Sequence, residues 1–202
     1  MKLTLQKLER AVASGTRPQA ELVATVKNLL GQLQVLSDIV TSFSEFAKMP
    51  LPRNERMDLV AVIREVESVF SGDEKIDLQL QLPDSPVYMT GDSKLMNRIL
   101  ANILINAGQS ARPQQKRVHV RIGLEVKEDT HKVLLAISDD GSGIAAEVRE
   151  RVFIPRFSTK KEGSGIGLAV ARHGVEQMGG TIWFETEEGK GTTFYLQFPL
   201  LD

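Results

Sequence analysis

The sequence predicts an α+β protein in which an α-helical hairpin precedes a two-layer α/β sandwich. Apolar residues recur every three or four positions over much of the first 49 residues, whereas helical and strand-like patterns alternate over residues 50–202. Between them, Pro50 and Pro52 stop the preceding helix, since neither proline can continue it. We therefore expect two domains, residues 1–49 and residues 50–202.

The first domain is expected to be a helical hairpin. Residues 14–18 (Ser-Gly-Thr-Arg-Pro) interrupt it as a turn would, and a heptad seam follows, formed by Val26, Leu29, Leu33, Leu36, Val40, Phe43 and Ala47. One interpretation is an ordinary hairpin that folds back on the rest of the chain. The other is half of a four-helix bundle completed by a second copy. We expect this homodimer, because two helices alone leave apolar faces uncovered.

The second domain alternates helix and strand patterns. Helices are expected over residues 59–70, 93–110, 145–151 and 165–178. Strands are expected over residues 76–82, 118–126, 132–138, 181–186 and 192–198. A polar turn at residues 127–130 joins two of these strands, and the last two strands form a hairpin.

Composition excludes several classes of function. The 202 residues include 25 Lys and Arg and 26 Asp and Glu, and the net charge of -1 does not favour a nucleic-acid interface. The absence of cysteine excludes disulfides, thiolate metal sites and cysteine nucleophiles. No apolar run approaches the roughly 20 residues of a membrane-spanning helix, and the amino end lacks the apolar stretch of a signal peptide. We expect a cytoplasmic protein with no nucleic-acid partner and no membrane segment.

Asp139 ends a predicted strand and is followed by Gly141, Gly143 and Ile144. A carboxylate in this place can accept a hydrogen bond from the exocyclic amine of a base, and glycines let the backbone approach a flat ligand. Taken alone, a tight polar turn explains the segment as readily.

Residues 163–168 (Gly-Ser-Gly-Ile-Gly-Leu) open a predicted helix. The backbone N–H groups and the dipole at a helix start form an anion site, which glycine leaves open to phosphates. A Rossmann dinucleotide site would require a strand before the glycines. The preceding residues 157–162 are polar and not strand-like, which argues against that site.

Asn102 and Asn106 lie four residues apart and so on one face of an apolar helix. Two carboxamides there are costly unless they meet polar partners. A side-chain oxygen at this place can bind Mg²⁺, which prefers hard oxygen ligands. Helix caps or hydrogen bonds between helices remain the alternative for this pair taken by itself.

Four segments together resemble the N, G1, F and G2 boxes of a sensor histidine kinase, in family order and at similar spacing: Asn102–Ala107, Asp139–Ile144, Val152–Lys160 and Gly163–Leu168. Such kinases belong to the Bergerat-fold (GHKL) ATPases. Residues 189–194 are similar to the closing hairpin of those domains. Residues 36–40 and 43–50 are similar to the second dimerisation helix of the nitrogen-regulation branch, so the resemblance covers nearly the whole chain.

The resemblance implies that ATP and Mg²⁺ are the cofactors. Asp139 would bind the adenine amino group, Asn106 would be the Mg²⁺ ligand, and Asn102 would lie beside the phosphates. Phe153 and Phe157 would be pins of the lid over ATP, with a place in the core as the alternative for either. The further nucleotide-binding residues would be Gly141, Gly143, Ile144, Phe157, Thr159, Lys160, Gly163, Ser164, Gly165, Ile166, Gly167, Leu168 and Thr192.

Three departures from the family matter for the chemistry. In relatives that hydrolyse ATP with water, a Glu base stands where Asn102 stands here. An amide cannot take a proton from water, which favours phosphoryl transfer to a protein group. Gln109 stands where the family often has a basic residue, with Arg98 as a weaker substitute, and the lid between Lys160 and Gly163 is short.

No histidine matches the phospho-acceptor of the family. His119, His131 and His173 all lie outside the hairpin, and residues 1–6 resemble those that normally follow the acceptor. We therefore expect a chain that binds ATP without phosphorylating itself. The acceptor would belong to a longer parent, which can be membrane-bound, and would pass its phosphate to a response regulator. An anti-sigma type serine kinase, which lacks such a hairpin, and a non-enzymatic nucleotide-binding module are the alternatives.

Overall fold

The computed structural model describes residues 23–31, 52–160 and 165–201. The chain divides into two compact units, Met1–Met49 and Pro50–Asp202. In the first unit, residues 23–31 form a helix in which Leu29 is buried and Val26 is 42% exposed. The other heptad positions lie outside the described residues, and so does most of the predicted hairpin.

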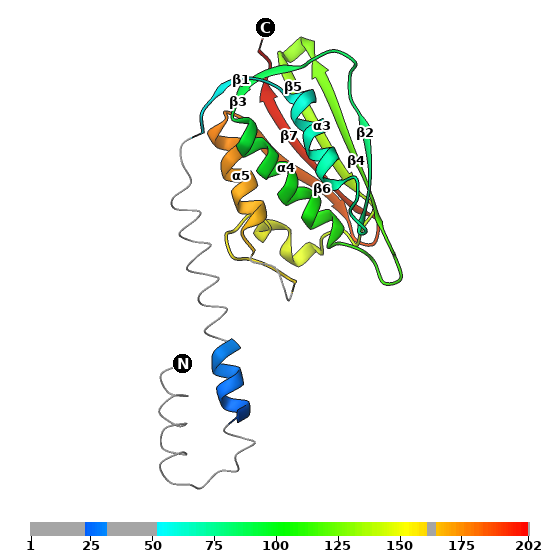
Figure 1. Cartoon of the computed structure of the whole chain (residues 1–202), viewed down its shortest axis with the longest axis vertical. Coiled ribbons are helices and arrows are strands. Elements are labelled where there is room, and N and C mark those ends of the chain that lie inside the picture. Colours follow the sequence, from blue (N-terminus) through cyan, green and yellow to red (C-terminus); the bar gives the residue numbers. More distant parts are fainter. Residues whose placement is uncertain (1–22, 32–51, 161–164, 202) are drawn as a thin grey trace. The chain divides into compact units, whose positions relative to one another are not determined.

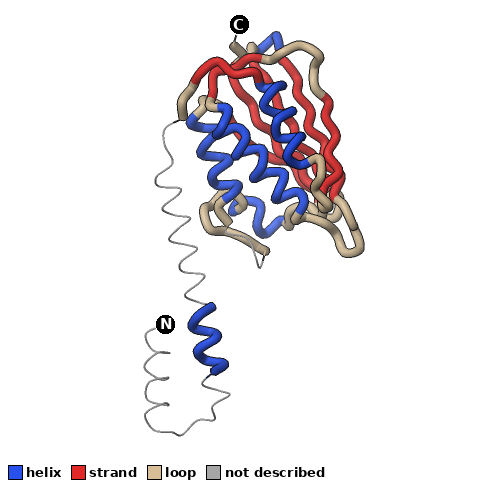
Figure 2. The backbone as a smooth tube through the Cα atoms, in the orientation of Figure 1, coloured by secondary structure: helices blue, strands red, loops and turns tan. Residues whose placement is uncertain are grey.

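In the described part of the second unit, three α-helices cover one face of a five-stranded sheet (Figure 1). The helices are α3 (Leu59–Phe70), α4 (Ser93–Gly108) and α5 (Gly167–Gln177). The strands lie in the order β2 (Ile76–Gln81), β4 (Val118–Lys127), β5 (Lys132–Asp139), β7 (Gly191–Pro199) and β6 (Thr181–Glu187). Strands β2 and β4 are parallel, and the other neighbours are antiparallel. Figure 2 shows the two layers, which confirm the predicted fold class.

The sequence did not predict a small second sheet. Strand β1 (Glu55–Asp58) pairs antiparallel with β3 (Tyr88–Gly91), and their facing residues Met57 and Met89 are both buried. Each strand has four residues, which is too short for a clear alternation of apolar and polar side chains. Two 3₁₀ helices lie where the sequence predicted a turn and a short helix: η1 (Glu128–Thr130) occupies the turn, and η2 (Ala146–Arg151) is the short helix.

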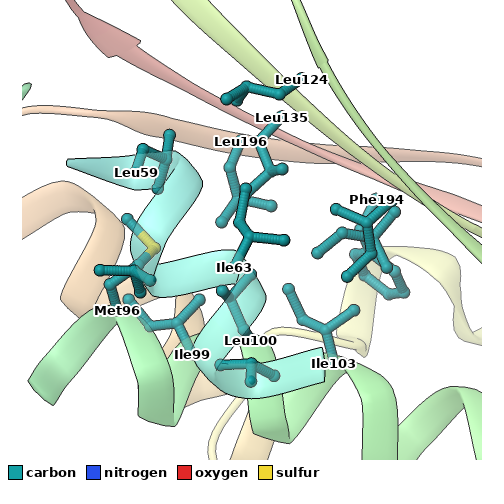
Figure 3. Close-up of a cluster of buried hydrophobic side chains, with 14 of the residues drawn as sticks. Leu59, Ile63, Met96, Ile99, Leu100, Ile103, Leu124, Leu135, Phe194 and Leu196 are labelled. Carbon is teal, nitrogen blue, oxygen red and sulfur yellow. The ribbon is translucent and has the colours of Figure 1, made fainter. Parts of the chain in front are cut away.

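The hydrophobic core lies between the two layers (Figure 3). Helix α3 contributes Leu59 and Ile63, and helix α4 contributes an apolar stripe at helical spacing. The sheet supplies every second residue of its central strands, among them Leu135 and Leu196, because successive side chains point to opposite faces. Burying one such leucine or isoleucine contributes about 1.5–3 kcal/mol. None of the described helices has the length and apolar character needed to span a bilayer.

Aspartates cap the first turns of α3 and α4. The Asp58 carboxylate accepts the Val60 N–H, and Asp92 Oδ1 accepts the N–H groups of Lys94 and Leu95 at 2.9 and 3.1 Å. Asp92 Oδ2 also accepts the Arg53 N–H at 2.9 Å, which ties the chain before β1 to the start of α4. Burial acts to raise the pKa of Asp92, but these three N–H groups bring it below its ordinary value of 3.8.

Replacing Asp92 by Ala is expected to lower the free energy of unfolding by about 1 kcal/mol at pH 7, because an N-cap acceptor is lost. Since the pKa is lowered in the folded protein, the stabilisation is present above pH 3.8 and is lost as pH falls through the folded pKa. Urea unfolding at several pH values measures both effects. Asp84→Ala, at an exposed position, is the control. A constant difference between wild type and Asp92→Ala down to acid pH would contradict the role of the carboxylate.

Candidate functional site

Asp139 stands at the end of β5 with its carboxylate held by donors of the chain itself. Asp139 Oδ1 accepts the Gly141 N–H at 2.9 Å and lies 3.3 Å from the Ser110 hydroxyl oxygen. Burial raises the pKa of Asp139, against the lowering effect of hydrogen bonds from Gly141, Ser110 and the Thr192 backbone. A half-buried carboxylate at a strand end is available to accept a hydrogen bond from a ligand.

Ser110, which sequence reasoning missed, joins the end of α4 to this carboxylate. Its hydroxyl donates to the Ala107 carbonyl at 2.7 Å, and its own carbonyl accepts the Ser142 N–H at 2.7 Å. The Ser142 carbonyl accepts the Gly189 N–H, also at 2.7 Å. The helix end, the loop after β5 and the turn between β6 and β7 therefore meet at one point. A serine at the end of a predicted helix was the only local signal for this role.

The two glycines of the G1 box are required by close packing. A Cβ atom on Gly141 would collide with the Ser110 side chain, and it would lie 2.8 Å from the Ser110 carbonyl oxygen. Gly143 has a φ of +69°, and a Cβ atom there would collide with the Glu187 carbonyl. These contacts show why the loop needs glycine, whereas the role of both residues in shaping a base pocket stays a prediction.

The two asparagines of α4 lie near the amino end of α5. Asn102 Oδ1 is 3.5 Å from the place that a Cβ atom would take on Gly167, the first residue of α5. Asn106 Nδ2 donates to the Asn102 carbonyl at 2.9 Å, which directs the amide nitrogen toward the helix and leaves the oxygen for another partner. Unlike α3 and α4, helix α5 has no side-chain N-cap among the described residues, which leave its first N–H groups available to an anion.

The F and G2 boxes are hydrogen-bonded to each other. The Arg156 N–H donates to the Gly165 carbonyl at 2.8 Å. Gly165 has a φ of +67°, and a Cβ atom there would come within 2.7 Å of the Phe157 carbonyl oxygen. Two predicted triphosphate residues of this run, Gly163 and Ser164, lie outside the described residues.

Phe153 packs in the core, the alternative that the sequence left open. Its ring lies 5.9 Å from that of Phe184 and 6.4 Å from that of Phe194, measured between centroids. Phe157 instead lies under the Arg151 guanidinium, 4.2 Å from its ring centroid. The first phenylalanine therefore anchors the segment in the core, and only the second stays a candidate for the lid.

Lys160 reaches the carboxyl end of α4. Its ammonium donates to the Asn106 carbonyl at 3.1 Å and to Gln109 Oε1 at 3.2 Å. Burial lowers the pKa of Lys160, while the charge of Asp139 acts to raise it. The structure thus brings Lys160, Asn106 and Asp139 into one region.

The other predicted nucleotide residues fall into two groups. Thr192 is buried and its hydroxyl lies 3.0 Å from that of Thr186, which in turn accepts the Ile144 N–H at 2.9 Å. Thr159 is exposed. The apolar members Ile144, Ile166 and Leu168 are partly or fully buried, and Ile144 and Leu168 pack against the core.

The histidines and acids of the described residues form no metal cluster. The Nδ1 atom of His119 lies 2.8 Å from Asp77 Oδ2 on the exposed side of β2 and β4. Asp140 accepts the His119 N–H at 2.9 Å and the Gln115 side-chain N–H at 2.7 Å. The second acid of the pair Asp139–Asp140 therefore orders the loop after α4.

Residues 91–202 match the family described as histidine kinase-, DNA gyrase B-, and HSP90-like ATPase. The chain belongs to this ATPase family. Asp139, the two asparagines and the start of α5 all fall within the matched residues. The family confirms ATP as the ligand class of the domain.

Known proteins narrow the family further. The chain is 32% identical to the sensor histidine kinase ZraS of Escherichia coli (strain K12) over 95% of its own length and 40% of that protein. It is 27% identical to sporulation kinase B of Bacillus subtilis (strain 168), over 86% of the chain and 40% of the relative. The chain thus spans 40% of the length of these two relatives.

Solved structures agree with this ATPase family assignment. The mycobacterial sensor histidine kinase MprB has a TM-score of 0.62 and 28% identity, over 73% of this chain and 97% of that one. The catalytic domain of histidine kinase ThkA has a TM-score of 0.63 and 27% identity, over 73% and 95%. The chain is the ATP-binding core of a sensor histidine kinase, as predicted, whereas its place in the nitrogen-regulation branch stays a prediction.

Replacing Gly141 by Ala is expected to lower the free energy of unfolding by about 1–3 kcal/mol, because the new Cβ atom must displace Ser110. Gly123→Ala on β4 is the matched control, since a Cβ atom there meets nothing within 4 Å. Thermal and urea unfolding of both variants check the difference. Equal stability of the two variants would show that the loop after β5 can shift to accommodate the Cβ atom without a loss of free energy of unfolding.

Proposed function

We propose that this chain transfers the γ-phosphoryl group of Mg·ATP to a histidine of a longer parent protein, and that an aspartate of a response regulator receives the phosphate next. The approach of Asn102 to the open amino end of α5 carries this proposal. N–H groups at a helix start favour phosphate, and the residue beside them is an amide and not a carboxylate. The site is therefore suited to holding a phosphoryl group and unsuited to activating water.

Asp139 is proposed to recognise the adenine. Its carboxylate can accept a hydrogen bond from the exocyclic amine while Gly141 and Ser110 hold it in place. Gly141 and Gly143 let the loop pack closely against Ser110 and Glu187 beside the place proposed for the base, and Ile144 supplies an apolar neighbour. Burying this carboxylate costs free energy, and it forms no ion pair with any of the described residues, which is typical of a binding site.

Asn106 is the proposed ligand of Mg²⁺, and its environment fits that role. Its amide nitrogen is engaged by the Asn102 carbonyl, so the side-chain oxygen remains for the metal. A single protein oxygen suffices, because Mg²⁺ usually retains waters and substrate phosphates as its other ligands. When bound, the metal neutralises phosphate charge.

Positioning and charge stabilisation account for the transfer, since phosphoryl transfer requires little covalent chemistry from the protein. The residues from Gly163 to Leu168 are proposed to hold the triphosphate at the start of α5. Phe157 and Thr159, with Lys160, are proposed to close the site from the segment before it. The acceptor imidazole would then approach the γ-phosphate in line.

The partners proposed for the chain follow from its relatives. Residues 1–49 are proposed to form a partial dimerisation hairpin without the acceptor, and residues 50–202 the catalytic domain. A homodimer through this hairpin, a response-regulator receiver domain and a cytoplasmic location are supported by the similarity to proteins named sensor histidine kinases.

Asp139→Asn is expected to abolish saturable binding of Mg·ADP and Mg·ATP. The substitution removes the charged acceptor and presents an amide N–H₂ that can face the adenine amine. Calorimetric titration measures both nucleotides, and Asp129→Asn at an exposed turn is the matched control. Wild-type affinity in Asp139→Asn would show that the base binds elsewhere.

Supplying a separate dimerisation domain that carries an acceptor histidine is expected to yield acid-labile, radiolabelled phosphohistidine on that domain. The chain alone should remain unlabelled. Asn106→Ala should reduce labelling by about tenfold or more, because the phosphate charge is then poorly neutralised. Binding of ATP without any labelling of the supplied domain would favour the non-enzymatic nucleotide-binding module.

A further inference from the structure

At the carboxyl end of α4, two oxygen atoms accept hydrogen bonds from the ammonium of Lys160, a residue far along the chain. Lys160 Nζ lies 3.1 Å from the Asn106 carbonyl oxygen and 3.2 Å from Gln109 Oε1. The Asn106 carbonyl lies in the last turn of α4, where carbonyl groups lack partners within the helix, and Gln109 follows three residues later as the C-cap. The negative end of the helix dipole also favours a positive charge at this place.

Both acceptors of the Lys160 ammonium are neutral, so the ammonium keeps its net positive charge. A carbonyl and an amide oxygen fix the position of Lys160 without cancelling its charge, as a carboxylate would. The ammonium has three N–H donors, and these two contacts engage two of them. Within the described residues, the ammonium therefore keeps its charge and one donor for an anion beside Asn106.

The backbone of Gln109 is fixed by hydrogen bonds, so its side chain can position another residue. It is the C-cap of α4, and its backbone N–H donates to the Ile105 carbonyl at 3.1 Å. The next residue is Ser110, which is tied to Asp139 and Ser142. The backbone at position 109 is thus fixed by the contacts that shape the base pocket.

We propose that Gln109 is a positioning residue that holds the Lys160 ammonium beside Asn106, where this charge meets the terminal phosphate of the nucleotide. The inference rests on the proposed function, because it takes ATP as the ligand. The neutral amide of Gln109 holds Lys160 in place, and the Lys160 ammonium is the phosphate-binding cation.

The test is the affinity of each variant for Mg·ATP and for adenosine, measured by calorimetry. Gln109→Ala and Lys160→Ala should each weaken Mg·ATP binding by about three- to tenfold and leave adenosine binding unchanged, because only ATP carries the phosphates. The double variant should bind Mg·ATP as Lys160→Ala does, since the amide acts through the lysine. Gln109→Glu should bind Mg·ATP less tightly than Gln109→Ala.

An exchange variant separates positioning from a general structural role. Gln109→Lys combined with Lys160→Gln moves the cation onto the helix and should restore Mg·ATP affinity to within about threefold of wild type. Gln79→Ala and Lys94→Ala, both exposed and outside the site, are the matched controls. Thermal unfolding of each variant verifies the fold.

Three results would overturn the inference. They are wild-type Mg·ATP affinity in Gln109→Ala, equal losses for ATP and adenosine, and multiplicative losses in the double variant. Each leaves the proposed function standing as long as the wild-type chain binds Mg·ATP. Absence of Mg·ATP binding by the wild-type chain would overturn both proposals.

Discussion

The contact between Ser110 and Asp139 is the constraint on which the rest of the site depends. It joins the end of α4 to the end of β5, and the Ser110 carbonyl also fixes the loop through Ser142. The close approach leaves no room for a side chain on Gly141. Because α4 is rigid, fixing its end also fixes Asn102 and Asn106 with respect to the sheet. One junction between the two layers therefore sets the geometry of base and phosphate recognition together.

The site contains groups that make the folded protein less stable. Burial raises the pKa of Asp139 although three donors of the chain favour its charged form, and the start of α5 lacks the side-chain cap that α3 and α4 have. Such groups cost stability and are retained where a ligand uses them. The apolar core shown in Figure 3 supplies the stability that offsets this cost.

The segment from Phe153 to Lys160 shows how a loop can carry charge to a defined place. Its first aromatic ring is anchored among Phe184 and Phe194, its middle is hydrogen-bonded to Gly165, and its last lysine contacts the end of α4. These attachments connect the start of α5 with the end of α4. The segment can therefore respond to a ligand at either helix while its base stays in the core.

The sequence by itself determined the three α-helices and the five strands of the main sheet. The predicted helix at 59–70 is α3, and the long helix and most strands agree within a few residues, because apolar periodicity is a local property. The pairing of β1 with β3, the placement of Phe153 in the core, and the contacts of Ser110 and Gln109 were decided only by the tertiary structure. Each of these joins residues far apart in the chain, and such contacts depend on how the layers pack, which no local pattern of side chains encodes.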